Sequence, residues 1–423
     1  MEPSTPAAPP FASTGPAAAE APSPDPVIAL EKQYVLQTYN RYPLVLSRGK
    51  GCYLYDTAGK RYLDLITGIG VNALGHAHPR LMKIIREQSA RLIHCSNLYY
   101  HEYQGRLAER IAKASGLDRV FFCNSGAESM EGALKMVRAH GRSISPEKFE
   151  TVALFDSFHG RTFGALSITG QPKYRERFEP MLPGARFVPR NDMTALEQVV
   201  NERTAGIVLE LVQGEGGIHP MTAEFVRKAR ELASRYQALL VFDETQCGVG
   251  RPGTYFSYQL NDPVVMPDIA VAAKPVACGL PMGFVACNET AASTLPAGMH
   301  GTTFGGGPLV CRVGLEFFDV LDELLPSISQ VGSYFRMRLT ELMKRYSFIK
   351  EVRGVGLMIG VELEFPGKQL VLDLIEAGVL MNCTHDVVLR ALPPYLLTEQ
   401  EVDRAVRGID KVFKKAKPPE AAA

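Results

Sequence analysis

The sequence has no tryptophan, no excess of charge of either sign and no apolar run long enough to cross a membrane. Its 423 residues carry 46 lysines and arginines against 45 aspartates and glutamates, a formal net charge of +1. Such a balance gives no global field to attract nucleic acid or an anionic membrane. No apolar run reaches the roughly 18 residues that a spanning helix needs. We therefore expect a protein that binds neither nucleic acid nor a membrane.

The cysteines are few and scattered. None of the eight forms a C-x-x-C pair, so neither a disulfide framework nor a zinc ribbon is expected. Reduced thiols in a cytoplasmic enzyme are the simplest interpretation. His76 and His78 are a weak metal candidate, because a turn explains the pair better, and we expect no metal site.

The first residues lack the features of a targeting segment. Residues 1–26 contain eight prolines and seven alanines, and no lysine or arginine precedes Lys32. A signal peptide needs a basic start and an apolar middle, and a mitochondrial presequence needs arginines. Proline at this density blocks helices and strand ladders. We predict a disordered tail over residues 1–27 and a second, frayed tail over 416–423.

The rest of the chain is predicted to be an α/β protein. It is 46% apolar and 22% charged, an ordinary globular mix. Short apolar runs alternate with amphipathic stretches, which is typical of βαβ units and a mostly parallel sheet. The predicted strands cover residues 120–122, 151–155, 207–209, 239–242 and 269–272, and the predicted helices cover about 127–139 and 225–236.

The far end of the chain changes character. Residues 329–346 indicate a helix and 355–364 a strand, and Thr398 with Glu401 fits a capping box that opens a last helix. Short elements at both ends of one long α/β stretch favour a large domain and a smaller one built from both termini. The predicted division is 28–75 for the first part of the small domain, 76–310 for the large domain and 311–415 for the second part.

Candidate site residues follow the predicted strands, because open parallel sheets bind ligands beyond the carboxyl ends of their strands. Asp243 ends one predicted strand, and Gln246 follows three residues later. An acid in this place is also common as a helix N-cap or as a surface group. Asp243 by itself leaves these alternatives open.

Lys274 is the only charged residue between Ile269 and Asn288. Desolvation lowers the pKa of an ammonium group and leaves a nucleophilic amine, which is what a Schiff-base lysine needs. A lysine that reaches solvent at the edge of the sheet is the alternative.

Two glycine-containing turns are candidate anion sites. Residues 124–127 join a predicted strand to a predicted helix, and the backbone N–H groups at a helix start bind phosphate. A plain helix cap is the alternative. Three glycines at 305–307 follow Thr302 and Thr303, giving either a second, hydroxyl-lined anion site or simply a loop.

A third glycine motif is a weaker candidate. Residues 248–253 match G-x-G-x-x-G and follow a predicted strand. A dinucleotide site also needs a helix that opens on these glycines, and residues 252–255 do not continue as one. We therefore do not expect a nicotinamide or flavin cofactor.

Pyridoxal phosphate requires the combination that these candidates supply. Lys274 would condense with the aldehyde, Asp243 would keep the pyridine nitrogen protonated, and the helix start would hold the phosphate. Phe158 is an aromatic residue suited to stack on the ring.

The chain resembles the class-III aminotransferases, which are pyridoxal-phosphate enzymes of fold type I, over nearly all of residues 28–415. The matching motifs occur in the family's order: FCNSGAE at 122–128, FHGRT at 158–162, QGEGG at 213–217, FDETQ at 242–246, AKP at 273–275 and HGTTFGG at 300–306. Together they are highly specific. The resemblance implies a mostly parallel seven-stranded sheet in a large domain and a smaller α+β domain from both termini.

The resemblance also implies which residues bind the cofactor. Lys274 would bind the aldehyde and then move a proton between the two imine carbons, and Asp243 would pair with the pyridine nitrogen. The other implied contacts are Ser125, Gly126 and Ala127 at the phosphate, Phe158 and Thr245 on the ring faces, Gln246 at the ring hydroxyl, and Thr303 at the phosphate of the partner subunit. A homodimer with shared active sites follows from the last of these.

The implied substrate residues are Arg161, Thr302, Glu215 and Arg390. The two arginines would bind substrate carboxylates. Glu215 would pair with Arg390 while the amine donor is bound and release it for 2-oxoglutarate. A ping-pong enzyme whose donor has one nearby carboxylate and whose acceptor has two needs such a masked positive charge.

Three positions depart from the family pattern. Leu211 replaces a proline after Glu210, Thr245 replaces a valine or isoleucine, and Gly307 replaces an asparagine. The first two changes are conservative in volume or placement. The third removes an amide from the loop that carries Thr303.

Within the family the resemblance is strongest to the acetylornithine aminotransferases. Ile69 stands where ornithine aminotransferases carry a tyrosine, and residues 382–385 resemble the acetylornithine branch. The implied reaction moves the terminal amine of N-acetyl-L-ornithine to 2-oxoglutarate, giving N-acetyl-L-glutamate 5-semialdehyde and L-glutamate in arginine biosynthesis.

Three alternatives stay open. The donor could be succinylornithine, ornithine or 4-aminobutyrate. A racemase or aminomutase of the same fold would also need Lys274 and Asp243, but it would not need the switchable pair of Glu215 and Arg390. A protein that binds without catalysis would not need an intact lysine and aspartate.

Overall fold

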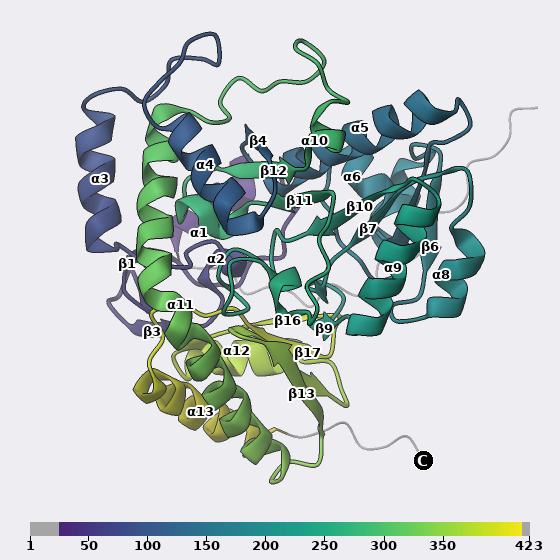
Figure 1. Cartoon of the computed structure of the whole chain (residues 1–423). Helices are drawn as coiled ribbons and strands as arrows, with labels where there is room; N and C mark the ends of the chain where they lie inside the picture. Colours follow the sequence, from purple (N-terminus) through teal and green to yellow (C-terminus); the bar gives the residue numbers. More distant parts are fainter. Residues whose placement is uncertain (1–24, 417–423) are drawn as a thin grey trace, which may run out of the picture.

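The computed structural model describes residues 25–416, and its centre is a seven-stranded sheet (Figure 1). The strand order is β4-β12-β11-β10-β7-β5-β6, and only β12 runs against its neighbours. The strands are β4 (Arg119–Cys123), β5 (Glu150–Leu154), β6 (Ala185–Val188), β7 (Thr204–Leu209), β10 (Leu239–Asp243), β11 (Ile269–Ala272) and β12 (Gly283–Cys287). The predicted mostly parallel seven-stranded sheet is confirmed.

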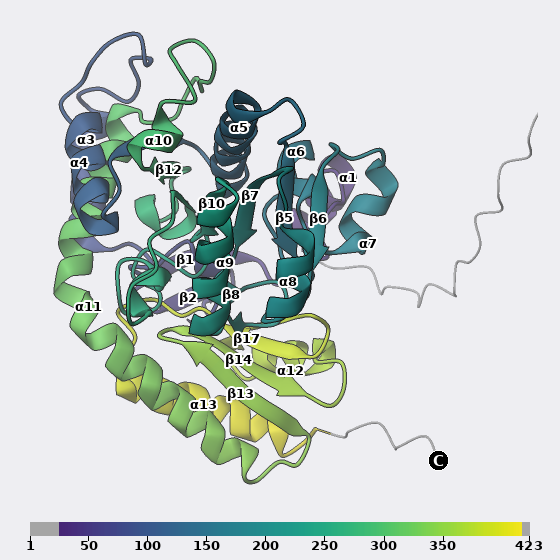
Figure 2. The same ribbon diagram turned by 45° about the vertical axis from the view of Figure 1, so that its right-hand side comes forward.

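Helices cover both faces of this sheet (Figure 2). Helix α5 (Gly126–Ile144) packs on the face that carries Val241, whereas α9 (Ala223–Arg235) packs on the face that carries Leu240 and Phe242. Since alternate residues of a strand point to opposite faces, a strand covered on both sides is apolar throughout. That is why the inner strands β10 and β11 are apolar throughout, apart from Asp243 at the end of β10.

The small domain joins the two ends of the described chain. Its first sheet contains β1 (Leu46–Lys50), β2 (Tyr53–Asp56), β3 (Arg61–Asp64) and β15 (Val379–Leu380), with β15 parallel to β3. Its second sheet has the order β13-β14-β17-β16, formed by Ile349–Val355, Met358–Leu363, Val388–Ala391 and Asn382–Thr384. Helices α12 (Lys368–Glu376) and α13 (Glu399–Phe413) pack beside them, and α13 begins with the predicted capping box at Thr398 and Glu401.

Helix α11 (Pro308–Met343) passes from one domain to the other. The helix predicted over 329–346 is therefore only its second half, which follows Pro326, a proline inside the helix. The predicted boundary between 310 and 311 falls in its first turn, so no linker separates the two domains there.

The strand predicted over 355–364 is the second arm of a hairpin. Strand β13 ends at Val355, and Gly356, whose φ is +52°, lies in the turn before β14. An apolar run that continues through a turn does not reveal where the chain reverses.

The remaining elements are short or lie outside the main sheets. The helices are α1 (Pro26–Tyr34), α2 (Thr67–Gly70), α3 (Pro79–Ser89), α4 (Gln104–Ser115), α6 (Phe163–Ser167), α7 (Pro172–Arg175), α8 (Met193–Val199) and α10 (Glu289–Ala292), and the strands are β8 (Val212–Gln213) and β9 (His219–Pro220). Four-residue 3₁₀ helices begin at Ser257 and Lys274, and a three-residue one at Glu176. Within the described residues, no helix is long and apolar enough to cross a membrane.

Most of the predicted tails lie outside the described residues, which omit 1–24 and 417–423. The last part of the first tail is helical rather than irregular. Asp25 caps α1 by accepting a hydrogen bond from the Val27 N–H, 2.8 Å away, and Pro26 occupies the first helical position.

Candidate active site

Asp243 and Lys274 lie at the carboxyl ends of two adjacent parallel strands. Asp243 is the last residue of β10 and pairs with Val271 of β11, and Lys274 begins the 3₁₀ helix that follows β11. Asp243 is only 5% exposed, and Lys274 is partly buried. The structure thus brings these two predicted residues to one end of the sheet.

The surroundings of Lys274 favour its neutral amine. Burial lowers the pKa of its ammonium group, and the nearby Arg390 guanidinium lowers it further, although Glu215 and Asp243 act in the opposite direction. Within residues 25–416 no carboxylate lies within ion-pair distance of the Lys274 nitrogen, which leaves the amine available.

The start of helix α5 faces the end of strand β10. Ser125 is the N-cap, and its hydroxyl accepts a hydrogen bond from the Glu128 N–H at 3.2 Å. Gly126 and Ala127 follow and are partly exposed. A Cβ atom at Gly126 would lie 2.5 Å from Cγ2 of Thr245, so only glycine allows this close approach. The first backbone N–H groups of α5, which have no partner within the helix, therefore lie close to the end of β10.

Two aromatic rings hold Arg161. Its guanidinium carbon lies 3.9 Å from the centre of the Tyr174 ring and 5.3 Å from that of Phe158. The two rings meet edge to face, 6.0 Å apart. Arg161 is exposed and has no carboxylate partner in the part of the chain that the structure describes. A guanidinium held in this way can accept a carboxylate from solution. Tyr174 was not among the predicted residues.

Arg390 and Glu215 form a buried ion pair. Arg390 Nη1 lies 2.6 Å from Glu215 Oε1 and 3.0 Å from Gln246 Oε1, and Arg390 Nε donates to Asn382 Oδ1 at 3.1 Å. The Arg390 side chain is 1% exposed and that of Glu215 is 24% exposed. Burial alone would raise the pKa of Glu215, but Arg390 and then Lys274 outweigh it and lower the pKa. Gln246 therefore contacts the ion pair, a contact that the motif did not indicate.

Sequence reasoning assigned no role to His159 or Glu210, although His159 belongs to the FHGRT motif. His159 Nδ1 lies 2.8 Å from Asp243 Oδ2, and its buried Nε2 has no hydrogen-bond partner among the described residues. Burial lowers the pKa of His159, but its hydrogen bond to Asp243 and the adjacent carboxylates outweigh this and raise it. The position of His159 within the motif was the only available signal.

Glu210 is a second buried carboxyl behind Asp243. Its two oxygens accept hydrogen bonds from the N–H groups of Phe158 at 2.9 Å and Gly214 at 3.1 Å. Burial, with a contribution from the Asp243 carboxylate, raises the pKa of Glu210 to about 7. Glu210 links the chain segment of Phe158 to the loop that carries Glu215.

The loop with Thr302 and Thr303 is held by two asparagine side chains. Asn124 Nδ2 donates to the Thr302 hydroxyl at 3.0 Å, Asn97 Nδ2 donates to the Gly305 carbonyl at 3.0 Å, and Thr303 is exposed. Gly307, which replaces the family's asparagine, is the N-cap of α11 and provides no side-chain cap. The missing amide therefore leaves the start of α11 uncapped.

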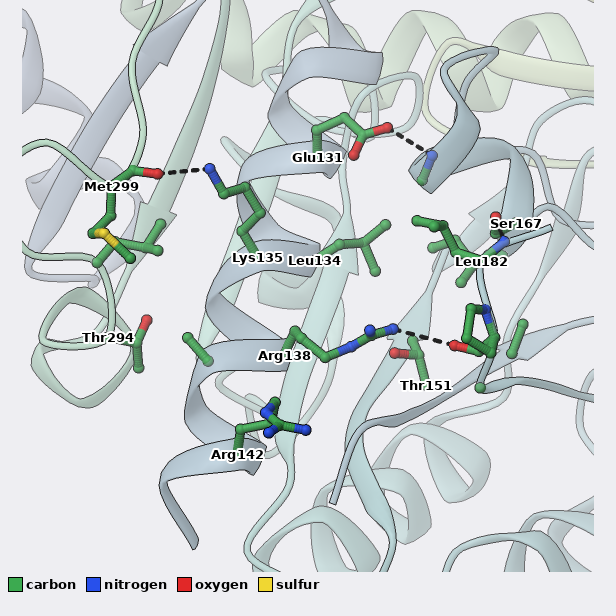
Figure 3. A pocket seen from close by; sticks show the side chains of 17 residues that line it. Glu131, Leu134, Lys135, Arg138, Arg142, Thr151, Ser167, Leu182, Thr294 and Met299 are labelled. Atoms are coloured by element: carbon green, nitrogen blue, oxygen red, sulfur yellow. Dashed lines mark hydrogen bonds between the residues drawn. The ribbon is translucent and has the colours of Figure 1, made fainter. Parts of the chain in front are cut away.

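A hollow of about 330 Å³ lies elsewhere, along the outer face of α5 (Figure 3). None of the predicted site residues lines it. At its edges Lys135 donates to the Met299 carbonyl at 2.7 Å and Arg138 to the Pro183 carbonyl at 3.2 Å. No cluster of three metal-ligating side chains occurs among residues 25–416.

The sequence model of the class-III aminotransferases matches residues 34–413. The chain belongs to the class-III aminotransferases. Pyridoxal phosphate is accordingly its cofactor. The tight cradle at Gly126, the unpaired amine of Lys274 and the buried acid at Asp243 fit the phosphate, the aldehyde and the ring nitrogen of this cofactor.

Relatives and solved structures extend the likeness over almost the whole chain. The acetylornithine aminotransferase of Methanocaldococcus jannaschii is 45% identical, over 92% of this chain and 98% of its own length. The acetylornithine aminotransferase of Aquifex aeolicus is 43% identical, over 90% of this chain and 100% of its own length. The structure of the Toxoplasma gondii ornithine aminotransferase is similar, with a TM-score of 0.88 and 32% identity. The match covers 92% of this chain and 93% of that one. The structure of the Stenotrophomonas maltophilia N-acetylornithine aminotransferase has a TM-score of 0.79 and 32% identity. The match covers 92% of this chain and 98% of that one.

Proposed function

We propose that this aminotransferase moves the terminal amino group of N-acetyl-L-ornithine to 2-oxoglutarate, in arginine biosynthesis. The products are N-acetyl-L-glutamate 5-semialdehyde and L-glutamate. The observation that carries the proposal is the near full-length similarity, at 43–45% identity, to relatives named acetylornithine aminotransferase. Ile69, where ornithine aminotransferases carry a tyrosine, supports the acetylated donor over free ornithine.

The chain's own residues would hold the cofactor and move the proton. When bound, pyridoxal phosphate supplies an aldehyde for amines and a ring that withdraws electrons. Lys274 Nζ would take a proton from one substrate carbon and return it to the other, and burial, which lowers the pKa of its ammonium group, favours the amine that this role needs. Asp243, oriented by its hydrogen bond with His159, would keep the ring nitrogen protonated.

The remaining cofactor contacts follow the geometry at the strand ends. The N–H groups of residues 125–127 would bind the phosphate at the start of α5. Phe158 and Thr245 would enclose the ring, and Gln246 would reach its hydroxyl.

Glu215 and Arg390 would let one pocket accept two kinds of substrate. With the amine donor bound, Arg161 holds the carboxylate and Glu215 neutralises Arg390. With 2-oxoglutarate bound, the Glu215 side chain turns away and Arg390 binds the second carboxylate, while Gln246 keeps its contact with Arg390. Thr302 would line the same pocket. This pair also separates an aminotransferase from a racemase, which has no second carboxylate to accommodate.

We further propose a cytoplasmic homodimer. Thr303 is exposed on a loop beside Phe304, which is 67% exposed, so neither side chain is covered by its own chain. Thr303 would reach the phosphate held by the partner subunit, and each active site would be complete only in the dimer.

A half-reaction screen tests the substrate. Protein loaded with cofactor is mixed with N-acetylornithine, succinylornithine, ornithine or 4-aminobutyrate, and the change in cofactor absorption is followed. We expect N-acetylornithine to react with the highest kcat/KM, and 2-oxoglutarate to restore the starting spectrum. High rates with 4-aminobutyrate and none with N-acetylornithine would contradict the assignment. Failure of 2-oxoglutarate to restore the spectrum would favour a racemase.

A further inference from the structure

The loop that carries Glu215 is held in place by the small domain. Residues 214–218 connect β8 to β9, and the backbone is left-handed at Gly217 and at Ile218, whose φ is +59°. Thr384 of β16 donates from its hydroxyl to the Glu215 carbonyl at 2.8 Å. A loop with this backbone needs external contacts to keep one conformation.

Arg353 of β13 makes the strongest of these contacts. Its Nη2 donates to the Gly217 carbonyl at 2.6 Å, and its Nε donates to the same carbonyl at 2.9 Å and to that of Ile218 at 3.2 Å. The Arg353 side chain is only 6% exposed. Its Nη1 pairs with Glu351 and Glu362, which neutralise the charge and orient the donors toward the loop.

Arg353 and Arg390 stand in one row of the sheet. Arg353 pairs with Gly360, Gly360 pairs with Arg390, and Arg390 pairs with Asn382. Residues paired across neighbouring strands place their side chains on the same face of a sheet. The two arginines therefore point to the same side, separated by one glycine, and both reach the loop.

Gly360 lets the loop lie directly on this row. A Cβ atom there would lie 3.0 Å from Cβ of Ile218, closer than ordinary packing allows. The loop is thus seated on the glycine, with its Glu215 side chain on one arginine and its carbonyls on the other.

We propose that Arg353 is a positioning residue for the ion pair between Glu215 and Arg390. By fixing the carbonyls of Gly217 and Ile218, it keeps the loop backbone still, so that only the Glu215 side chain moves when the substrates alternate. Arg353 and Arg390, which lie in the same row of the sheet, then position the Glu215 carboxylate and supply its partner. This inference rests on the proposed role of the pair in substrate exchange.

Loss of Arg353 should change the two half-reactions unequally. A loosened loop weakens the pair, so Arg390 carries an unmasked charge while the amine donor is bound. For Arg353→Met we expect KM for N-acetylornithine to rise about tenfold, with kcat less affected. We expect KM for 2-oxoglutarate to stay the same or fall, and glutarate to inhibit the donor half-reaction more strongly.

Arg336→Met is the matched control. Arg336 donates to the Gly356 carbonyl in the turn of the same hairpin, at 3.2 Å, and to Ser333 on its own helix. A general weakening of the hairpin would affect both variants alike. Arg353→Lys keeps the charge but not the forked donors, and we expect it to recover part of the donor KM.

Amide hydrogen exchange provides a readout independent of turnover. In Arg353→Met, with and without cofactor, exchange over residues 212–220 should be faster than in the wild type, while Arg336→Met leaves it unchanged. Unaltered exchange at 212–220, or equal losses in both half-reactions, would overturn the proposal. If Arg353→Met does not fold, Arg353→Lys decides by the same two measurements.

Glu215→Gln separates this inference from the proposed function. If Glu215→Gln leaves the ratio of kcat/KM between the two half-reactions as in the wild type, the proposed role of the pair in substrate exchange is wrong. If Glu215→Gln changes them unequally but Arg353→Met and Arg353→Lys do not, the pair works without the positioning role of Arg353.

Discussion

Burial acts in opposite directions on two ionisable groups beside the sheet ends. It lowers the pKa of the Lys274 ammonium and raises that of the Glu210 carboxyl to about 7, in each case because the charged form is poorly solvated. Asp243 lies near both and is hydrogen-bonded to His159. The pKa values of Lys274 and Glu210 therefore depend on their burial as well as on their residue type.

Lys274→Ala should retain the cofactor and lose transamination. Proton transfer by a positioned side chain contributes about a hundred- to ten-thousandfold, so single-turnover rates with N-acetylornithine should fall by that order. The phosphate and ring contacts do not involve Lys274, and cofactor should still co-purify. Lys83→Ala, at a 70% exposed lysine of α3, is the control. A Lys274→Ala protein with wild-type turnover would show that another base acts.

Glu210→Gln should change the pH dependence of stability. A carboxyl whose pKa is raised from 4.5 to about 7 by folding binds its proton more tightly in the folded state. It stabilises the fold below pH 4.5, and this contribution is lost as the pH rises to about 7. The wild type should lose stability relative to the variant over that window, on the order of 1 kcal/mol per pH unit.

Denaturant unfolding at pH 5 and pH 7.5 measures this difference. Any constant effect of the amide cancels, because only the change with pH is compared. Glu87→Gln, at an exposed position of α3, should show no such change. If the difference in unfolding free energy between the wild type and Glu210→Gln does not vary with pH, folding does not raise the pKa of this carboxyl.

At the scale of elements, the site is a junction between a helix start and a strand end. The N-terminus of α5 and the carboxyl end of β10 approach so closely that a Cβ at Gly126 would collide with Thr245. The backbone N–H groups at this helix start are the ones that we propose bind the phosphate, and the same contact brings the helix close to the strand that ends at Asp243.

Gly126→Ala should weaken cofactor binding, and Thr245→Ser in the same chain should restore most of it. The serine lacks the methyl group that the new Cβ would meet at 2.5 Å. We expect the cofactor Kd to rise about tenfold in the single variant. Gly105→Ala, in the first turn of α4, has open space around its Cβ and is the matched control. A double variant that binds no better than Gly126→Ala would place the defect in the backbone rather than in this contact.

At the scale of the whole molecule, two loops form an exposed apolar edge. Residues 90–103 and 293–307 lie side by side at the top of Figure 1, joined by hydrogen bonds from Asn97 to Gly305 and from His101 to Gly306. Leu98 and Phe304 on these loops are 84% and 67% exposed. Apolar side chains gathered in this way mark an interaction surface, which is where the proposed dimer places its partner.

Mixed dimers test whether the active sites are shared. Lys274→Ala and Thr303→Val homodimers should each be defective. In a heterodimer of the two, one site combines the intact Lys274 of one subunit with the intact Thr303 of the other. After unfolding and refolding of an equal mixture, about half of the dimers are heterodimers and each has one intact site. We therefore expect about a quarter of the activity of the same amount of wild-type protein. No recovery above the separate variants would contradict shared sites.

Local sequence patterns predicted five of the seven strands of the central sheet, the strand-end acid, the lysine among apolar residues and the helix-start turn, whereas β6 and β12 were not predicted. These are local features, since burial on two faces requires apolar runs and a helix start requires a cap. The division at 76–310 stays a prediction, and helix α11 shows that apolar periodicity does not mark where one domain ends.

The tertiary structure alone decided which distant groups meet. The bond between His159 and Asp243 and the seat of the 214–218 loop on Arg353 and Arg390 join segments 84 to 175 residues apart. Such contacts depend on strand register and on the approach of two sheets, where a shift of one residue turns a side chain to the other face. No local pattern encodes that register, so only the folded chain reveals the arginine row and the buried histidine.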